Sequence, residues 1–209
     1  MVETICNKIT LRIRAKMPEI NDERAEVINY GLQLLVGELP KTFIILFTAW
    51  ILGVLDLTIL AVIVVTPYRA VVGGVHFKTH IGCIVATSLF YIGNAMSSKY
   101  VILGQTIQYI LTSVTWIFAI VMISLYAPAD TEDVPILRKR ERRIKKILSY
   151  TIMSTMLILS LIIKNTEISN MFLFGTILQT IAITRMMYKI AGNRYGYEEY
   201  IKHKVQIVT

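Results

Sequence analysis

Residues 68–83, which read YRAVVGGVHFKTHIGC, carry the side chains of this chain best suited to nucleophilic chemistry. They bring together one cysteine, Cys83, two histidines, His76 and His80, and a pair of glycines. A thiol that passes its proton to an imidazole can attack a carbonyl carbon and form a thioester. The residue types therefore indicate acyl transfer, provided that the fold brings the thiol close to an imidazole.

The spacing of these residues limits how they can meet. His76, His80 and Cys83 would share one face of a regular helix, because they lie at offsets of 0, 4 and 7. A helix rises by about 1.5 Å per residue, so His76 and Cys83 would still be about 10 Å apart. A thiol–imidazole hydrogen bond needs a separation of about 3 Å. A His76–Cys83 pair therefore requires His76 to lie on non-helical backbone, which Gly73 and Gly74 make accessible.

Two other interpretations of the segment stay open on spacing alone. A lone cysteine in an apolar segment is most often a small buried side chain without chemistry. The donors of His76, His80 and Cys83 are also ones that zinc accepts, with water as the fourth ligand. His80 is otherwise better explained as a residue at the membrane interface than as a base.

The composition of the chain indicates a membrane protein. Of its 209 residues 55% are hydrophobic and only 17% charged, and the mean hydropathy is +0.58. The net charge of +8 would suggest nucleic acid in a soluble protein, but in a membrane protein it is typical of cytoplasmic loops and contact with anionic lipid. No nucleic-acid partner is therefore expected. The two cysteines, Cys6 and Cys83, are too few for a disulfide framework and are predicted to be free.

The expected fold class is all-α and polytopic, with a single integral-membrane domain over residues 1–209. Several apolar runs approach the roughly 20 residues that a helix needs to cross a bilayer. Full transmembrane helices are predicted at 81–97, 103–126, 147–163 and 171–187.

Residues 1–40 are predicted to form an N-terminal interfacial segment. Its first 26 residues are polar and mixed in charge, so no cleavable signal peptide is expected. Residues 25–37 are apolar but too short to span, and predict an amphipathic helix that ends at Gly37 and Pro40.

The apolar run 41–66 is interrupted by Gly53 and Asp56. A carboxylate inside lipid is costly unless it faces protein or water. An N-terminus in the cytoplasm requires an even number of crossings before Pro67. Either the run bends near these residues, as a hairpin or re-entrant pair of short helices, or residues 25–39 enter the membrane as well.

The distribution of charge predicts the topology. Residues 127–146 form a predicted loop, and seven of the nine positions in 138–146 are Lys or Arg, which places the loop in the cytoplasm. Counting crossings from it places the basic tail 188–209 and the segment with Arg69 and His76 on the same side. The prediction is a multi-pass protein of the cell membrane with both termini and the candidate site at the cytoplasmic face.

Two sequence blocks carry a resemblance to a known family. The pattern R-x3-GG-x-H-x6-C, which begins at Arg69 and ends at Cys83, resembles the signature of the accessory gene regulator B family. These are bacterial membrane peptidases that process quorum-sensing propeptides. A second block, YAPAD at residues 126–130 followed by Pro135-Ile136 and the basic run, resembles the family's loop after the middle helices.

The resemblance implies a membrane cysteine endopeptidase with Cys83 as nucleophile and His76 as general base, working as a homodimer without metal or cofactor. Its substrate would be a short propeptide with an amphipathic membrane-bound leader, a central signal sequence and an acidic C-terminal tail. Removal of the tail would leave a thioester on Cys83, from which the signal segment closes to a thiolactone or lactone. The candidate substrate-binding residues are Arg69, Gly73, Gly74, Arg138, Lys139 and Arg140, the two glycines through their backbone.

A function of another class is a small membrane transporter or peptide exporter without proteolytic activity. It predicts a polar lining along several helices. The sequence offers Asp56 and scattered Ser, Thr, Gln and Asn for such a lining.

Overall fold

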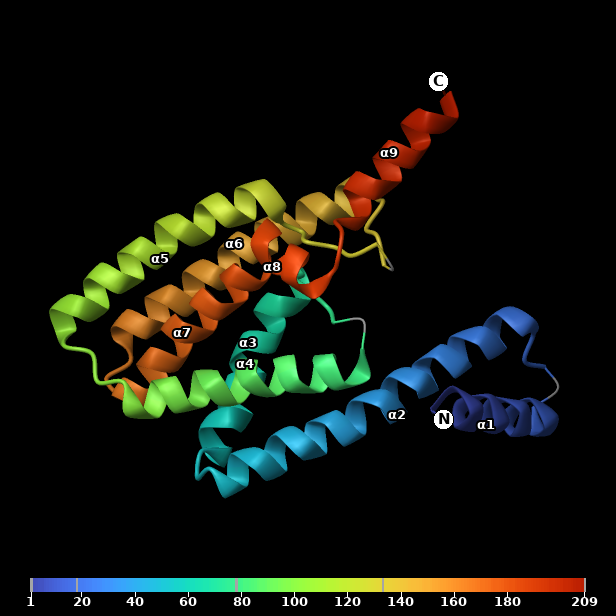
Figure 1. The fold of residues 1–209 in the computed structure, drawn as a ribbon, viewed down its shortest axis with the longest axis horizontal. Helices are drawn as coiled ribbons and strands as arrows, with labels where there is room; N and C mark the ends of the chain where they lie inside the picture. The colour runs from blue at the N-terminus through green and yellow to red at the C-terminus, as the bar shows by residue number, and fades with distance from the viewer. Residues whose placement is uncertain (1, 18, 78, 133, 209) are drawn as a thin grey trace. The chain divides into compact units, whose positions relative to one another are not determined.

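A computed structural model describes residues 2–17, 19–77, 79–132 and 134–208 of the chain (Figure 1). The regular secondary structure of these ranges is helical, which confirms the all-α fold class. The chain divides into two compact units, residues 1–48 and 49–209. Each unit is described below by itself.

The first unit is built on two helices, α1 (Val2–Lys16) and the first part of α2 (Asp22–Ile51). Asn29 joins them, since its Nδ2 donates to Oδ1 of Asn7 at 2.7 Å. The prediction that a helix ends at Gly37 and Pro40 is wrong, because the 30-residue helix α2 continues past both to Ile51. Pro40 removes one backbone hydrogen bond, but the apolar residues after it would leave many more groups unpaired in lipid if the helix stopped.

The second unit begins with the end of α2 and a tight turn into α3 (Leu55–Val72). Gly53 has a φ of 65°, and its N–H donates to the carbonyl of Trp50. The predicted bend near this glycine is confirmed. The helix after it extends beyond the predicted end at residue 66, because α3 continues through Pro67 to Val72. Asp56 lies exposed in the first turn of α3, where the helix dipole favours a carboxylate.

The next helices match two of the predicted spans and modify two others. The predicted spans at 81–97 and 103–126 are confirmed as helices. The predicted loop 127–146 already contains the start of a helix at Lys139. The predicted single span 171–187 is two helices with a 70° bend between them. The Thr184 hydroxyl accepts from the N–H of Met187 and caps the second of these helices. The six helices are α4 (His80–Tyr100), α5 (Gln105–Tyr126), α6 (Lys139–Ile162), α7 (Thr166–Ala182), α8 (Arg185–Ala191) and α9 (Gly196–Val208).

Helix α7 lies among α3, α4, α5 and α6, and contacts all four (Figure 1). Small residues allow this close packing. A Cβ added to Gly175 would lie 2.7 Å from the Val65 side chain on α3 and 3.0 Å from the Asn94 side chain on α4. Such small-residue contacts are typical of helices that associate within a membrane.

Within the described residues, five helices, α2 to α6, are long and apolar enough to cross a membrane, and the bent pair α7–α8 qualifies as a sixth span if it is counted as one. Helix α5 shows the pattern clearly. One face is buried in the bundle and the other presents exposed aliphatic side chains at helical spacing, as expected for contact with lipid. These exposed residues are Ile107, Ile110, Val114, Ile117 and Val121.

Candidate active site

The loop after α3 places His76 outside any helix. Helix α3 ends at Val72, residues 73–77 are irregular, and α4 begins at His80. Gly73 and Gly74 have φ values of 81° and 140°, a region of backbone conformation that favours glycine. His76 therefore lies on the irregular backbone that a pairing with Cys83 requires.

The loop is joined to the segment after α5 by backbone hydrogen bonds. The N–H of Ala129 donates to the carbonyl of Val72 at 2.8 Å, and the N–H of Gly74 donates to that of Ala129 at 2.9 Å. A Cβ on Gly73 would lie only 2.2 Å from the Ala129 oxygen. The two sequence blocks that carry the family resemblance are thus in direct contact, and the glycines are needed for the shape of the loop.

Three residues from the C-terminal part of the chain hold the same loop. Gln179 on α7 donates from Nε2 to the carbonyl of Gly73 at 2.7 Å. The N–H of Val75 donates to the carbonyl of Ala182 at 3.2 Å. The backbone N–H of His76 donates to Oδ1 of Asn193 at 2.9 Å. Gln179 and Asn193 are not among the residues predicted from the sequence, although a glutamine inside an apolar span is a signal that marks functional positions.

Arg69 is half-buried and has partners within the chain. Its Nη2 donates to the carbonyl of Val75 at 3.0 Å and its Nη1 to Oε1 of Gln179 at 3.4 Å. Its guanidinium also lies over the ring of Phe90, 5.7 Å from the centroid. Arg69 therefore helps to hold the loop that carries His76, a role that the sequence does not reveal.

Cys83 lies in the first turn of α4 and is half-buried and free. Thr79 caps this helix, because its hydroxyl accepts from the N–H of Gly82 at 3.1 Å and its carbonyl from the N–H of Cys83 at 2.9 Å. The Sγ of Cys83 lies 4.0 Å from the hydroxyl of Thr87, one turn further along the helix. Partial positive charge at the start of a helix favours an anion such as a thiolate.

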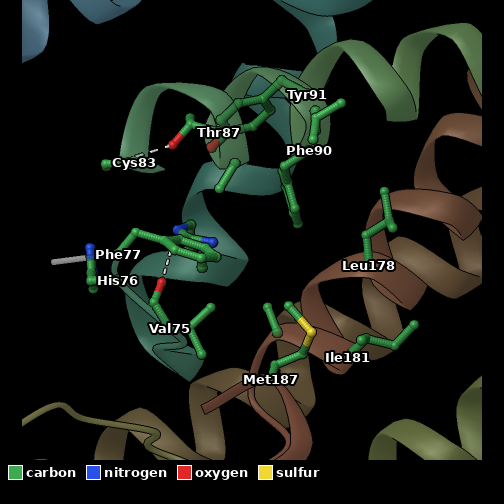
Figure 2. A pocket seen from close by; sticks show the side chains of 14 residues that line it. Val75, His76, Phe77, Cys83, Thr87, Phe90, Tyr91, Leu178, Ile181 and Met187 are labelled. Atoms are coloured by element: carbon green, nitrogen blue, oxygen red, sulfur yellow. Dashed lines mark hydrogen bonds between the residues drawn. The ribbon is translucent and has the colours of Figure 1, made fainter. Parts of the chain in front are cut away.

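His76 and Cys83 line the same cavity, which has a volume of about 320 Å³ (Figure 2). In the view of Figure 2, Leu178 and Ile181 of α7 lie across the cavity from Cys83. Other apolar lining residues are Phe77, Ala86, Phe90 and Met187. The arrangement sets a thiol and an imidazole at the edge of an apolar space.

The metal interpretation gains no support in the described part of the chain. No group of three or more His, Cys, Asp or Glu side chains there could hold a metal ion. The side chain of His80, the third member of the predicted ligand set, lies outside the described residues.

The basic run at 138–146 contains side chains of two kinds. Arg142 pairs with the buried carboxylate of Asp130 at 3.0 Å and lies over the ring of Tyr197, 4.1 Å from its centroid. Oδ2 of Asp130 also accepts a hydrogen bond from the N–H of Ile136 at 2.8 Å, so Asp130 shapes the loop before α6. Lys145 pairs with Glu141 and Lys146 donates to the carbonyl of Ser124, whereas four side chains of the run are exposed to solvent. The exposed ones are Arg138, Lys139, Arg140 and Arg143.

Two stacked tyrosines fix the C-terminal segment against the loop after α5. The rings of Tyr188 and Tyr195 are parallel with centroids 4.0 Å apart. Tyr188 donates from its hydroxyl to the carbonyls of Ala129 and Asp130, at 2.7 and 3.1 Å. Burial raises the pKa of Tyr195, so its hydroxyl stays protonated and donates to the carbonyl of Ile183.

Buried polar residues elsewhere in the bundle bind neighbouring backbone. Asn170 donates from Nδ2 to the carbonyl of Val101 at 2.7 Å, and the hydroxyl of Thr176 donates to the carbonyl of Phe172. Gln108 bridges to Ser169 at 2.8 Å. Asn170 and Gln108 thus join α7 to its neighbours, which is a different use from the polar lining that the exporter interpretation predicts.

Comparison with known sequences decides the family. The sequence profile described as accessory gene regulator B matches residues 6–183. The chain belongs to the accessory gene regulator B family. Two AgrB-like proteins of Listeria, from L. innocua serovar 6a and L. monocytogenes serotype 4a, are 25% and 24% identical to it over 83% of each chain. The accessory gene regulator protein B of Staphylococcus epidermidis is 27% identical over 81% of this chain and 84% of its own length. No solved structure matches the chain at a significant level.

The accessory gene regulator B family is associated with quorum sensing, in which its members act with a propeptide. The family match ends at Ile183, between α7 and α8. Asn193, which holds the loop of His76, and Tyr188, which holds the segment after α5, therefore lie in the part of the chain beyond the match.

Proposed function

We propose that this protein is a membrane cysteine endopeptidase that removes the C-terminal tail of a short signal propeptide. The observation that carries the proposal is the shared cavity of Cys83 and His76, one at the start of a helix and the other on an adjacent irregular loop. No metal or cofactor takes part in the proposed reaction.

In the proposed reaction His76 accepts the proton of the Cys83 thiol, and the thiolate attacks the scissile carbonyl. The carbon–nitrogen bond then breaks, the tail leaves as an amine with the proton returned by His76, and the remaining acyl group is held as a thioester on Cys83. The positive end of the α4 helix dipole stabilises the negative charge on the thiolate and on the carbonyl oxygen.

The second half of the reaction closes the ring. A thiol or hydroxyl of the substrate attacks the thioester, and the Cys83 thiolate leaves and takes back a proton. The product is a thiolactone or lactone. An apolar cavity favours this outcome over hydrolysis, because it keeps water from the thioester.

We further propose that Arg138, Lys139 and Arg140 bind the acidic tail of the substrate or anionic lipid at the cytoplasmic face. Their exposure at the start of α6 supports this role. Arg69, Gly73 and Gly74 contribute by shaping the loop of His76. Six crossings would return the chain to its starting side, in keeping with both termini in the cytoplasm. Homodimer formation stays a prediction.

The test is co-expression with a propeptide of the expected design from the neighbouring reading frame, followed by mass spectrometry of the products. Cys83→Ala and His76→Ala are expected to abolish tail release, and Cys6→Ala to leave it intact because Cys6 is buried in the first unit. Membrane amounts of each variant are measured on the same samples. Full tail release by the Cys83→Ala protein would refute the proposal.

A further inference from the structure

The cavity beside Cys83 has a chemical character of its own. Apart from the two reactive residues, its wall consists mainly of aliphatic and aromatic side chains from α4, α7 and α8, including Ala86, Leu178 and Met187 (Figure 2). Its volume of about 320 Å³ is near the lower end of the roughly 300–1,000 Å³ that is usual for small-ligand pockets. It is large enough for one or two side chains of a bound peptide.

The cavity is unsuited to an acidic side chain. Burying a carboxylate among apolar groups is costly unless a partner compensates its charge. Among the described residues of the wall the Lys or Arg side chain is Arg69, and two of its five N–H groups donate to Gln179 and to the carbonyl of Val75, so an acidic side chain would have to share the guanidinium with both. An apolar side chain meets no such cost and gains from leaving water or the headgroup region.

We propose, on the basis of the proposed endopeptidase function, that this cavity is the acyl-side specificity pocket. It binds a large apolar side chain on the residue whose carbonyl Cys83 attacks. The acidic tail lies on the other side of the scissile bond, and the exposed Arg138, Lys139 and Arg140 are the cations offered to it. An apolar pocket for the retained half and basic residues for the departing half distinguish the two sides of the cleaved bond.

The proposal is tested on the full-length protein in lipid nanodiscs with peptidyl acyloxymethyl ketones, which alkylate cysteine nucleophiles. Three probes differ only in the residue that bears the ketone: leucine, glycine or aspartate. The leucine probe is expected to label Cys83 at least about tenfold faster than the other two, since one methylene in an apolar pocket already changes specificity by about tenfold or more.

A pair of neighbouring variants on α4 locates the preference. Ala86→Phe fills the cavity, whereas Val85→Phe adds the same ring to an exposed neighbour that does not line it. Ala86→Phe is expected to slow labelling by the leucine probe to about the rate of the glycine probe. Val85→Phe is expected to keep the preference. The prediction for Ala86→Phe follows from loss of the space that the leucine side chain would occupy.

The outcomes separate the pocket from the endopeptidase function. Equal labelling by the three probes, while His76→Ala still slows all of them, would overturn the pocket and leave the endopeptidase intact. Labelling that is independent of His76 would overturn the endopeptidase function. A leucine preference seen only in detergent and absent in nanodiscs would show that a lipid chain fills the cavity, and would also overturn the pocket.

Discussion

The backbone N–H of His76 donates a 2.9 Å hydrogen bond to Oδ1 of Asn193, 117 residues further along the chain. Asn193 is only 8% exposed and lies between α8 and α9, beyond the part of the chain that matches the family. The candidate general base is therefore held by a segment that the motif pattern does not include. This contact makes the C-terminal segment part of the site.

Removing the acceptor at Asn193 is expected to lower kcat while KM changes little. Asn193→Leu keeps a similar volume but frees the loop of His76, and a misplacement of about 1 Å in a reactive group can cost about 100-fold in rate. Asn193→Asp keeps an acceptor oxygen and is expected to restore most of the rate. Tail-release kinetics of the two variants check this, and equal loss in both would contradict a positioning role for the amide oxygen.

An alanine at Gly73 is expected to abolish activity and lower the free energy of unfolding by more than about 1 kcal/mol. Its Cβ would lie 2.2 Å from the Ala129 oxygen, and a positive φ alone costs an L-residue about 1–2 kcal/mol. Gly93→Ala in α4 is the matched control, because nothing lies within 4 Å of its added Cβ. Thermal unfolding in detergent compares the two, and similar values for both would contradict the close approach of Gly73 to Ala129.

The hydroxyl of Thr87 is expected to support the reactivity of Cys83. Thr87→Val removes the group that lies 4.0 Å from Sγ, and is expected to slow alkylation by iodoacetamide by about twofold to tenfold, the usual range for one hydrogen bond. Thr87→Ser retains the hydroxyl and is expected to react at close to the original rate. Rates measured at one pH across the three proteins decide the matter. Faster alkylation of the valine variant would show that the hydroxyl only shields the sulfur.

Loss of the Arg142–Asp130 pair is expected to destabilise the loop before α6. The Asp130 side chain is 1% exposed, and Arg142→Gln would leave its buried carboxylate without its cation, at a cost of about 3 kcal/mol or more for a buried pair. Arg143 is exposed and next to Arg142, and Arg143→Gln is expected to have little effect. Limited proteolysis within residues 127–138 reports on the loop. Equal cleavage of the two variants would mean that the pair does not hold it.

The exposed basic residues at the start of α6 are expected to affect binding of the substrate more than its chemistry. Replacing Arg138, Lys139 and Arg140 together by glutamine is expected to raise KM for the tailed propeptide several-fold and to leave kcat nearly unchanged. The salt dependence of KM is expected to fall, because salt screens attraction between exposed charges. Replacing Arg143 alone supplies the control. An unchanged KM at low salt would remove these residues from the substrate site.

Much of the membrane architecture could be predicted from local sequence. Apolar runs of sufficient length correctly indicate α4 and α5, because a chain in lipid must satisfy its backbone within a helix. Gly53 correctly marks the turn between α2 and α3. The errors come from prolines and polar segments that usually end a helix but do not end it in this environment. Pro40 and Pro67 lie inside helices, and the polar, basic start of α6 is helical although its hydropathy indicates a loop.

The sequence by itself determined the family, the apolar spans and the need for His76 to lie on irregular backbone, because composition and spacing are local quantities. Only the tertiary structure decided what holds that backbone in place. Gln179 and Asn193 reach the loop from positions more than 100 residues away, and local pattern contains no record of such contacts. The tertiary structure also showed that Arg69 is bonded within the loop and that an apolar cavity lies beside Cys83. A cavity wall is assembled from helices that meet only when the chain folds.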